Sequence, residues 1–152
     1  MDTSPRDPRP LLGALWVFVV LNFFARDIHE LGRPGMLEQM MSGTIDGVEI
    51  TESLMLLGGA MIEVPILMGV LTLVLSRRVS RWVNIGASLL TAAMIVAGNL
   101  DPDLDNMFFM GIQAIALAVI AHVAWRWPED RTADAPGRAG RVIAGSRRSD
   151  VR

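Results

Sequence analysis

The chain has 152 residues, of which 51% are hydrophobic and 20% charged, and it contains no cysteine. Four runs, residues 11–25, 54–75, 82–100 and 107–125, make up about half of the chain and hold a single charged residue, Glu63. This separation of charged and apolar residues is typical of a multi-pass membrane protein and excludes a water-soluble enzyme. The absence of cysteine also excludes disulfides and zinc–thiolate sites, and no nucleic-acid partner is expected.

The first predicted span covers residues 10–31. Its uncharged part, residues 11–25, is too short for a bilayer core of about 30 Å, because a helix rises about 1.5 Å per residue. We therefore expect the helix to continue to Leu31. This extension carries four polar residues to membrane depth: Arg26, Asp27, His29 and Glu30. Residues 1–9 are predicted to be a cytoplasmic segment that is retained, because Phe23 stands where a signal peptidase needs a small residue.

The first loop, about residues 32–52, is the largest predicted element outside the membrane. Residues 34–41 are expected to form a short interfacial helix that Gly43 ends. The Asp46-Gly47 pair lies between short apolar pairs and predicts a hairpin turn. We expect this helix and hairpin to form a small extracytoplasmic subdomain that covers the outer end of the bundle.

Three further spans are predicted at about residues 53–76, 81–100 and 106–127. Together with the first span they give an all-α fold, a four-transmembrane-helix bundle over residues 10–127. The tail, residues 128–152, has hardly any large apolar residues and cannot bury a core, so it is predicted to be disordered and cytoplasmic.

The basic residues, all of them arginine, are unevenly distributed between the two predicted sides of the membrane. Twelve of the 14 lie in the N-terminal segment, around the second loop and in the segment from Arg126 to Arg152, and the other two, Arg26 and Arg33, lie at the end of the first span and in the first loop. The positive-inside rule then predicts a cell-membrane protein with both termini in the cytoplasm and the first and third loops outside.

Glu63 is the main candidate for a functional residue. It lies about nine residues into the second span, where an ionised carboxylate is unfavourable and normally faces the bundle interior with a partner. Pro65 lacks the N–H that would bond the Met61 carbonyl, so a kink is expected beside the acid. A catalytic acid/base, proton-carrying or ligand role is favoured for Glu63, and the alternative is a protonated glutamate that only orders the bundle.

Counting depth along the helices brings other polar residues to the same layer. We predict a pocket in the outer half of the membrane, with Asn22, Glu63 and Gln113 as its floor. Its rim comprises Arg26, Asp27, His29, Glu30 and Asn99. Arg26 is the expected counter-ion of Glu63, unless it pairs with Asp27 or Glu30. In this hypothesis Glu63, Arg26 and Asp27 carry the chemistry, and the other pocket residues bind the ligand.

A second polar stripe runs along one face of the third span and comprises Asn84, Ser88, Thr91, Ile95 and Gly98. Small residues at this spacing let helices approach closely, so we interpret the stripe as a packing surface. No metal site is predicted, because the two histidines lie far apart and the ten methionines show no spacing that demands copper. No cofactor is predicted, because Walker A and dinucleotide fingerprints are absent.

Several local patterns resemble a known group of proteins. They are the loop at residues 41–51, the Glu63-Val64-Pro65 step, Arg81-Trp82-Val83-Asn84 at the start of the third span, and Trp125-Arg126-Trp127-Pro128 after the fourth. Over about residues 10–128 the chain looks like an uncharacterised family of small bacterial four-helix membrane proteins, similar in style to the DoxX-like group. The resemblance supports the fold and implies no catalytic residues.

Three classes of function agree with these patterns. The first is a membrane enzyme or binder that acts on an apolar small molecule, such as a lipid or isoprenoid, by acid/base chemistry at Glu63. The second is a structural or accessory subunit, as a homo-oligomer or beside a partner membrane protein. The third is a proton-coupled transporter, although small multidrug-resistance transporters carry their glutamate in the first helix and use tyrosine, which this chain lacks.

Overall fold

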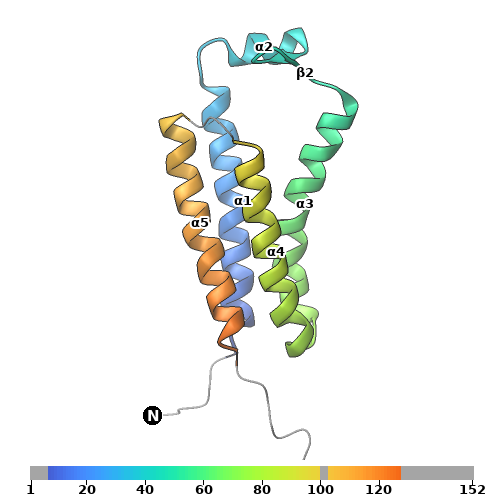
Figure 1. Cartoon of the computed structure of the whole chain (residues 1–152), viewed down its shortest axis with the longest axis vertical. Helices are drawn as coiled ribbons and strands as arrows, with labels where there is room; N and C mark the ends of the chain where they lie inside the picture. The colour runs from blue at the N-terminus through green and yellow to red at the C-terminus, as the bar shows by residue number, and fades with distance from the viewer. Residues whose placement is uncertain (1–6, 100–102, 128–152) are drawn as a thin grey trace, which may run out of the picture.

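The computed structural model describes residues 7–99 and 103–127, and the predicted tail, residues 128–152, lies outside these ranges. In chain order the described elements are α1 (Arg9–Leu31), α2 (Met36–Ser42), β1 (Thr44–Ile45), β2 (Val48–Glu49), α3 (Glu52–Val74), α4 (Arg77–Ala97) and α5 (Leu104–Trp125). The predicted all-α bundle of four long helices is confirmed (Figure 1).

The four long helices α1, α3, α4 and α5 are 21 to 23 residues long and apolar enough to cross a membrane. Much of their apolar surface is exposed, as at Leu56, which is 75% exposed, and Val74, which is 76% exposed. Such a surface is unfavourable in water, whereas the backbone of each helix is satisfied internally and the side chains suit contact with lipid. The chain is therefore built as a multi-pass membrane protein.

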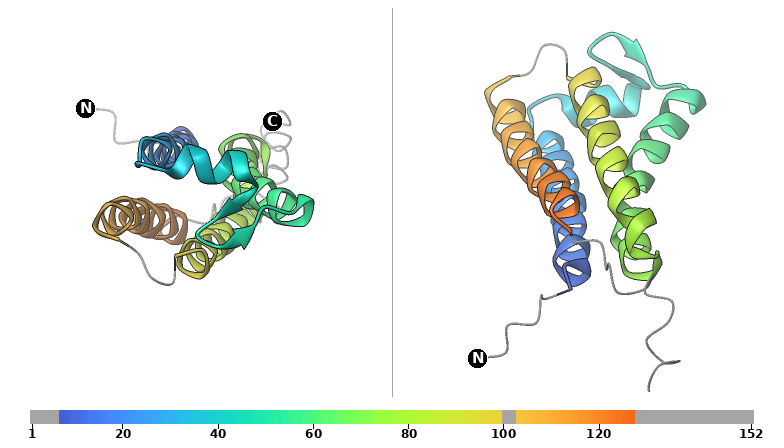
Figure 2. Two further views of the ribbon diagram at one scale, coloured as in Figure 1. Left: turned by 90° about the horizontal axis from the view of Figure 1, so that it is seen from above. Right: turned by 60° about the horizontal axis from the view of Figure 1, so that its bottom comes forward.

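The long helices form a ring in which α1 contacts α3 and α5, and α4 contacts the same two helices. Figure 2 shows α2 and the hairpin lying across one end of this ring, which we call the hairpin end. The opposite end, where α1 begins and α5 ends, is the terminal end (Figure 1). At the terminal end α3 and α4 are joined by only two residues, so Arg77, Arg78 and Arg81 lie within α4 and not in a loop.

The subdomain between α1 and α3 has the predicted form. Gly43 ends α2, and β1 pairs antiparallel with β2. The turn residues Asp46 and Gly47 have φ angles of 48° and 80°, the left-handed conformation that a two-residue hairpin turn of this kind requires. The Gln39 side-chain oxygen accepts a 2.8 Å hydrogen bond from the Asp46 backbone N–H, which ties the hairpin to α2.

A buried polar network holds the terminal half of the bundle together. The Asn84 Oδ1 atom accepts hydrogen bonds from Trp16 Nε1 at 2.7 Å and from Thr72 Oγ1 at 3.1 Å. The Asn84 Nδ2 atom donates to the Ser80 carbonyl at 2.7 Å. All four residues are fully buried, and one amide thereby connects α1, α3 and α4. Four residues of the predicted stripe, Asn84, Ser88, Thr91 and Ile95, are buried in the bundle, whereas Gly98 is exposed and follows the end of α4.

The two halves of α3 differ in packing. Pro65, Met68 and Thr72 are buried, whereas every residue from Thr51 to Ala60 is exposed. Figure 1 shows this first half of α3 leaning away from the bundle toward the hairpin end. Pro65 removes one backbone hydrogen bond at the boundary between the halves, which accounts for the change of direction there.

Candidate functional site at the hairpin end

A pocket of about 420 Å³ lies at the hairpin end, beneath α2 and the hairpin. Polar side chains from α1, the α1–α2 connection and the start of α5 line its lower part. Met36, Met40 and Ile45 of α2 and β1 line it from above. The remaining lining residues are Arg26, Glu30, Arg33, Asp46, Gly98, Asn99, Asp103 and Asn106. The predicted pocket residues Arg26, Glu30 and Asn99 are thus brought together.

Arg26 occupies the part of this pocket closest to the membrane. It lies five residues before the end of α1, about 8 Å along the helix axis. Its Nε atom donates a 2.7 Å hydrogen bond to Asn106 Oδ1 on α5. No carboxylate oxygen of the described residues lies within 4.0 Å of the Arg26 guanidinium. A half-buried cation is therefore bonded to a neutral amide, and no described residue bonds its terminal N–H groups.

Arg33 behaves differently, because it pairs with two of the three acidic residues that line the pocket. Its guanidinium pairs with Glu30 and lies 3.1 Å from Asp103 Oδ2. Asp103 is also the N-cap of α5 and accepts a 3.0 Å hydrogen bond from the Asn106 backbone N–H. That backbone bond, followed by the Arg33 and Asn106 side chains, outweighs desolvation and holds the pKa of Asp103 below its ordinary value of 3.8.

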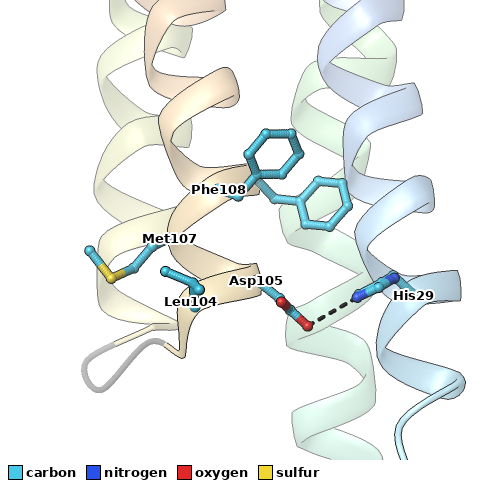
Figure 3. Close-up of a pocket in the computed structure, with 6 residues that line it drawn as sticks. His29, Leu104, Asp105, Met107 and Phe108 are labelled. Atoms are coloured by element: carbon cyan, nitrogen blue, oxygen red, sulfur yellow. Dashed lines mark hydrogen bonds and ion pairs between the residues drawn. The ribbon is translucent and has the colours of Figure 1, made fainter.

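His29 lines a separate, more apolar pocket of about 580 Å³ on the outside of α1 and α5. Its Nε2 atom lies 3.0 Å from Asp105 Oδ2, and its ring centroid is 5.9 Å from that of Phe109. Figure 3 shows the histidine and aspartate facing each other below the phenylalanine side chains of α5. Both members of the pair are more than half exposed, so the pair is accessible at the rim of an apolar surface.

The predicted floor of Asn22, Glu63 and Gln113 does not form in this structure. Asn22 donates to the Phe18 carbonyl of its own helix at 3.0 Å. Gln113 is fully buried and directed into the bundle, whereas Glu63 is exposed on α3. A residue's position along a helix gives its expected depth, but it does not fix the direction in which its side chain points. The roles predicted for the three residues stay predictions.

The predicted partners of Arg26 also differ from the observed one. Arg26 bonds Asn106 and forms no ion pair with Glu63, Asp27 or Glu30 among the described residues. Asp27 is exposed and lines neither hairpin-end pocket. Arg26 is thus directed toward α5, whereas Asp27 is directed away from it, because successive helical residues point about 100° apart.

Sequence reasoning missed three residues of the hairpin end: Asp103, Asp105 and Asn106. The sequence held a signal for them, because Asp103 and Asp105 lie in the third loop, on the same predicted side of the membrane as Arg33. It also missed Trp16, whose indole N–H needs a partner when buried and finds it at Asn84. Within residues 7–99 and 103–127, no group of three or more potential ligands could hold a metal ion.

The chain belongs to a family of unknown function, DUF6326, which matches residues 5–134. No curated protein matches the chain, and no solved structure matches it. Membership of this family agrees with the predicted resemblance to an uncharacterised group. The match does not test the likeness to the DoxX-like group.

Proposed function

We propose that this membrane protein binds an amphipathic small molecule whose anionic headgroup pairs with Arg26 in the pocket beneath α2. The observation that carries the proposal is the Arg26 guanidinium, which is half-buried and bonded only to the Asn106 amide among the described residues. A planar guanidinium pairs bidentately with carboxylates and phosphates. Neighbouring Arg33 is already occupied by Glu30 and Asp103, so Arg26 is the cation available to an incoming anion.

The surroundings of the pocket favour a ligand with an apolar chain. Met36, Met40 and Ile45 supply soft apolar contacts above the charged group. The exposed first half of α3, from Thr51 to Ala60, lies at the same end of the bundle and offers apolar surface at membrane depth. A fatty acid or an anionic lipid has the combination of headgroup and chain that these features would recognise.

The test uses thermal unfolding of the purified full chain in a neutral detergent, with oleate, phosphatidylglycerol or oleyl alcohol added. Ligand at about 100 times its Kd stabilises a protein by about 2.7 kcal/mol. Oleate or phosphatidylglycerol should raise the Tm, and oleyl alcohol, which has the same chain as oleate and no charge, should not. Whichever anion stabilises the protein identifies the source of the headgroup.

Two variants show whether Arg26 is responsible. Arg26→Gln should lose the stabilisation by the anion, and Arg126→Gln, which changes an arginine at the terminal end, should keep it. Equal stabilisation of the wild type by oleate and oleyl alcohol, or undiminished stabilisation of Arg26→Gln by oleate, would refute the proposal.

If the protein is an enzyme, we propose a different pair of residues for the acid/base chemistry. Glu63 has no hydrogen-bonded acid or base beside it among the described residues, whereas His29 and Asp105 lie 3.0 Å apart next to an apolar pocket. Proton transfer to a bound amphiphile would therefore use His29. Mass spectrometry of the lipids recovered after incubation with phosphatidylglycerol vesicles tests this, with His29→Gln as control. Unchanged lipids would remove the enzyme hypothesis and leave binding.

For the orientation, we propose that the hairpin end faces the extracytoplasmic side. Arg9, Arg77, Arg78, Arg81 and Arg126 all belong to the terminal end of the bundle. Arg81 lies over the rings of Trp82 and Trp125, an arrangement common where a membrane meets the cytoplasm. A reporter that is active only outside the cytoplasm, fused after Arg148, should be silent, and activity there would reverse the orientation.

A further inference from the structure

Glu63 is the central residue of α3 and has no partner among the residues that the structure describes. The helix runs from Glu52 to Val74, so Glu63 lies midway along a segment long enough to cross the membrane. The residue is exposed, and no described residue bonds it or forms an ion pair with it. A carboxyl group at this depth in contact with lipid alone is unfavourable, and membrane proteins normally give such a group a polar partner.

The direction of Glu63 excludes a partner inside its own bundle. Pro65, Met68 and Thr72 mark the side of α3 that packs on the other helices. Glu63 precedes Pro65 by two residues, a rotation of about 200° around the helix, and therefore lies on the opposite, outward side. A partner for Glu63 would therefore approach from outside the bundle.

The outward side of α3 has the spacing of a helix–helix contact surface. Its residues recur at intervals of four, three, four, three and four, and all are exposed: Leu56, Ala60, Glu63, Leu67, Val70 and Val74. This is the spacing that lets one helix face a second helix along its whole length. Gly59 and Ala60 lie one turn before Glu63, and a Cβ placed on Gly59 would have no atom within 4 Å. Small residues beside the acid allow close approach of a neighbouring helix.

A second copy of the same chain supplies the missing partner without any further residue. The neutral form of a carboxyl group has one donor and an acceptor, so two Glu63 side chains can bond each other reciprocally. Copies inserted in the same orientation are related by a two-fold axis normal to the membrane, and that axis puts Glu63 opposite Glu63 at equal depth. We propose that two copies of this chain pair through the outward faces of α3, with their Glu63 side chains hydrogen-bonded across the axis.

The test exploits the absence of cysteine from the chain. Single cysteines replace Leu67 or Val70, which are 53% and 61% exposed on the proposed interface, and Leu89, which is 65% exposed on α4 and serves as control. The purified full chain is reconstituted in lipid vesicles at low protein density and treated with a copper–phenanthroline oxidant. Leu67→Cys and Val70→Cys should form disulfide-linked dimers at least several-fold more than Leu89→Cys. Equal cross-linking at all three positions would overturn the proposal.

Substitution of Glu63 in the Val70→Cys background tests the role of the acid. Glu63→Leu should reduce the cross-linked fraction several-fold, while Glu63→Gln, whose amide also donates and accepts, should keep most of it. Neither should change the helix content or the Tm of the monomer, because Glu63 bonds none of the residues that the structure describes in its own chain. Unchanged cross-linking in Glu63→Leu contradicts the proposal. So does an absence of dimers in the wild-type background, which would assign the α3 face to lipid or to another membrane protein.

Discussion

The terminal half and the hairpin half of the bundle use polar residues in opposite ways. In the terminal half, Asn84 is fully buried and its amide is bonded to α1, α3 and α4 side chains or backbone. In the hairpin half, Arg33, Asp103 and His29 form exposed pairs, and α3 departs from the other helices. Fully satisfied buried groups rigidify a structure, whereas exposed pairs contribute little to stability. The terminal half therefore holds the bundle together and leaves the hairpin half free to bind.

The contrast in stability between the two halves is tested most strongly by removing the side-chain amide of Asn84. Asn84→Ala leaves the Trp16 indole N–H and the Thr72 hydroxyl without their buried acceptor and opens a cavity, so we expect a loss of about 2 to 4 kcal/mol in the free energy of unfolding. Asn22→Ala, which removes an amide bonded only to its own helix, should cost less than about 0.5 kcal/mol. Chemical denaturation in detergent measures both. Equal losses would mean that the network does not hold the terminal half together.

The second largest loss of stability is expected where α1 and α3 approach each other closely. A Cβ on Gly13 would lie 3.4 Å from the Gly69 carbonyl oxygen and 3.4 Å from Leu73 Cδ2, so there is room for a methyl group and for nothing larger. Gly13→Leu should destabilise the bundle by about 1 to 3 kcal/mol through overpacking. Gly86→Leu is the matched control, because no atom lies within 4 Å of a Cβ there. A stable Gly13→Leu variant would show that the two helices separate easily.

In the hairpin half we expect a smaller loss from Arg33→Gln, although it removes two ion pairs. Both pairs are partly exposed to solvent, and such pairs contribute about 0.2 to 1 kcal/mol each. The difference in Tm from the wild type should shrink at about 1 M salt, because screening already weakens the pairs. Arg126→Gln controls for the loss of one positive charge. A salt-independent loss as large as that of Asn84→Ala would contradict the division between the halves.

The smallest effect is the pH dependence of the Asp103 cap. Its pKa is lower in the folded protein, so its contribution to stability is fully present above the ordinary value of 3.8 and is lost as the pH falls below that through the folded value. Subtracting the acid unfolding curve of Asp103→Asn, which can still cap α5, from that of the wild type should isolate this contribution. A difference that appears near neutral pH would show that another group is responsible.

Several features of the hairpin end could be predicted from particular residues. The Asp46-Gly47 pair gave the turn because few residues tolerate the left-handed backbone, and Gly43 gave the end of α2 for the same reason. The extension of the first helix to Leu31 followed from the length needed to span a membrane, and it placed Arg26 at the pocket. The pocket itself depends on Asn106 and Asp103, which come from the far end of the chain.

Glu63 shows why the contacts of the polar side chains could not be predicted from the sequence. Its depth followed from counting residues, but its direction depends on how α3 is rotated about its axis. In a soluble helix the apolar stripe reveals that rotation. Around Glu63, α3 is apolar on all sides, and lipid is as apolar as a protein core, so hydropathy does not distinguish the two faces.

By itself the sequence determined the number of long apolar helices, their approximate ends and the hairpin, because these depend on local composition, helix length and turn chemistry. The tertiary structure decided which polar side chains meet. It joined Trp16 to Asn84, gave Arg26 the Asn106 amide and turned Glu63 outward. The physical reason is that packing between segments distant in the chain sets how each helix is rotated and which helices pair. In an almost uniformly apolar segment, the hydropathy pattern does not reveal that rotation or pairing.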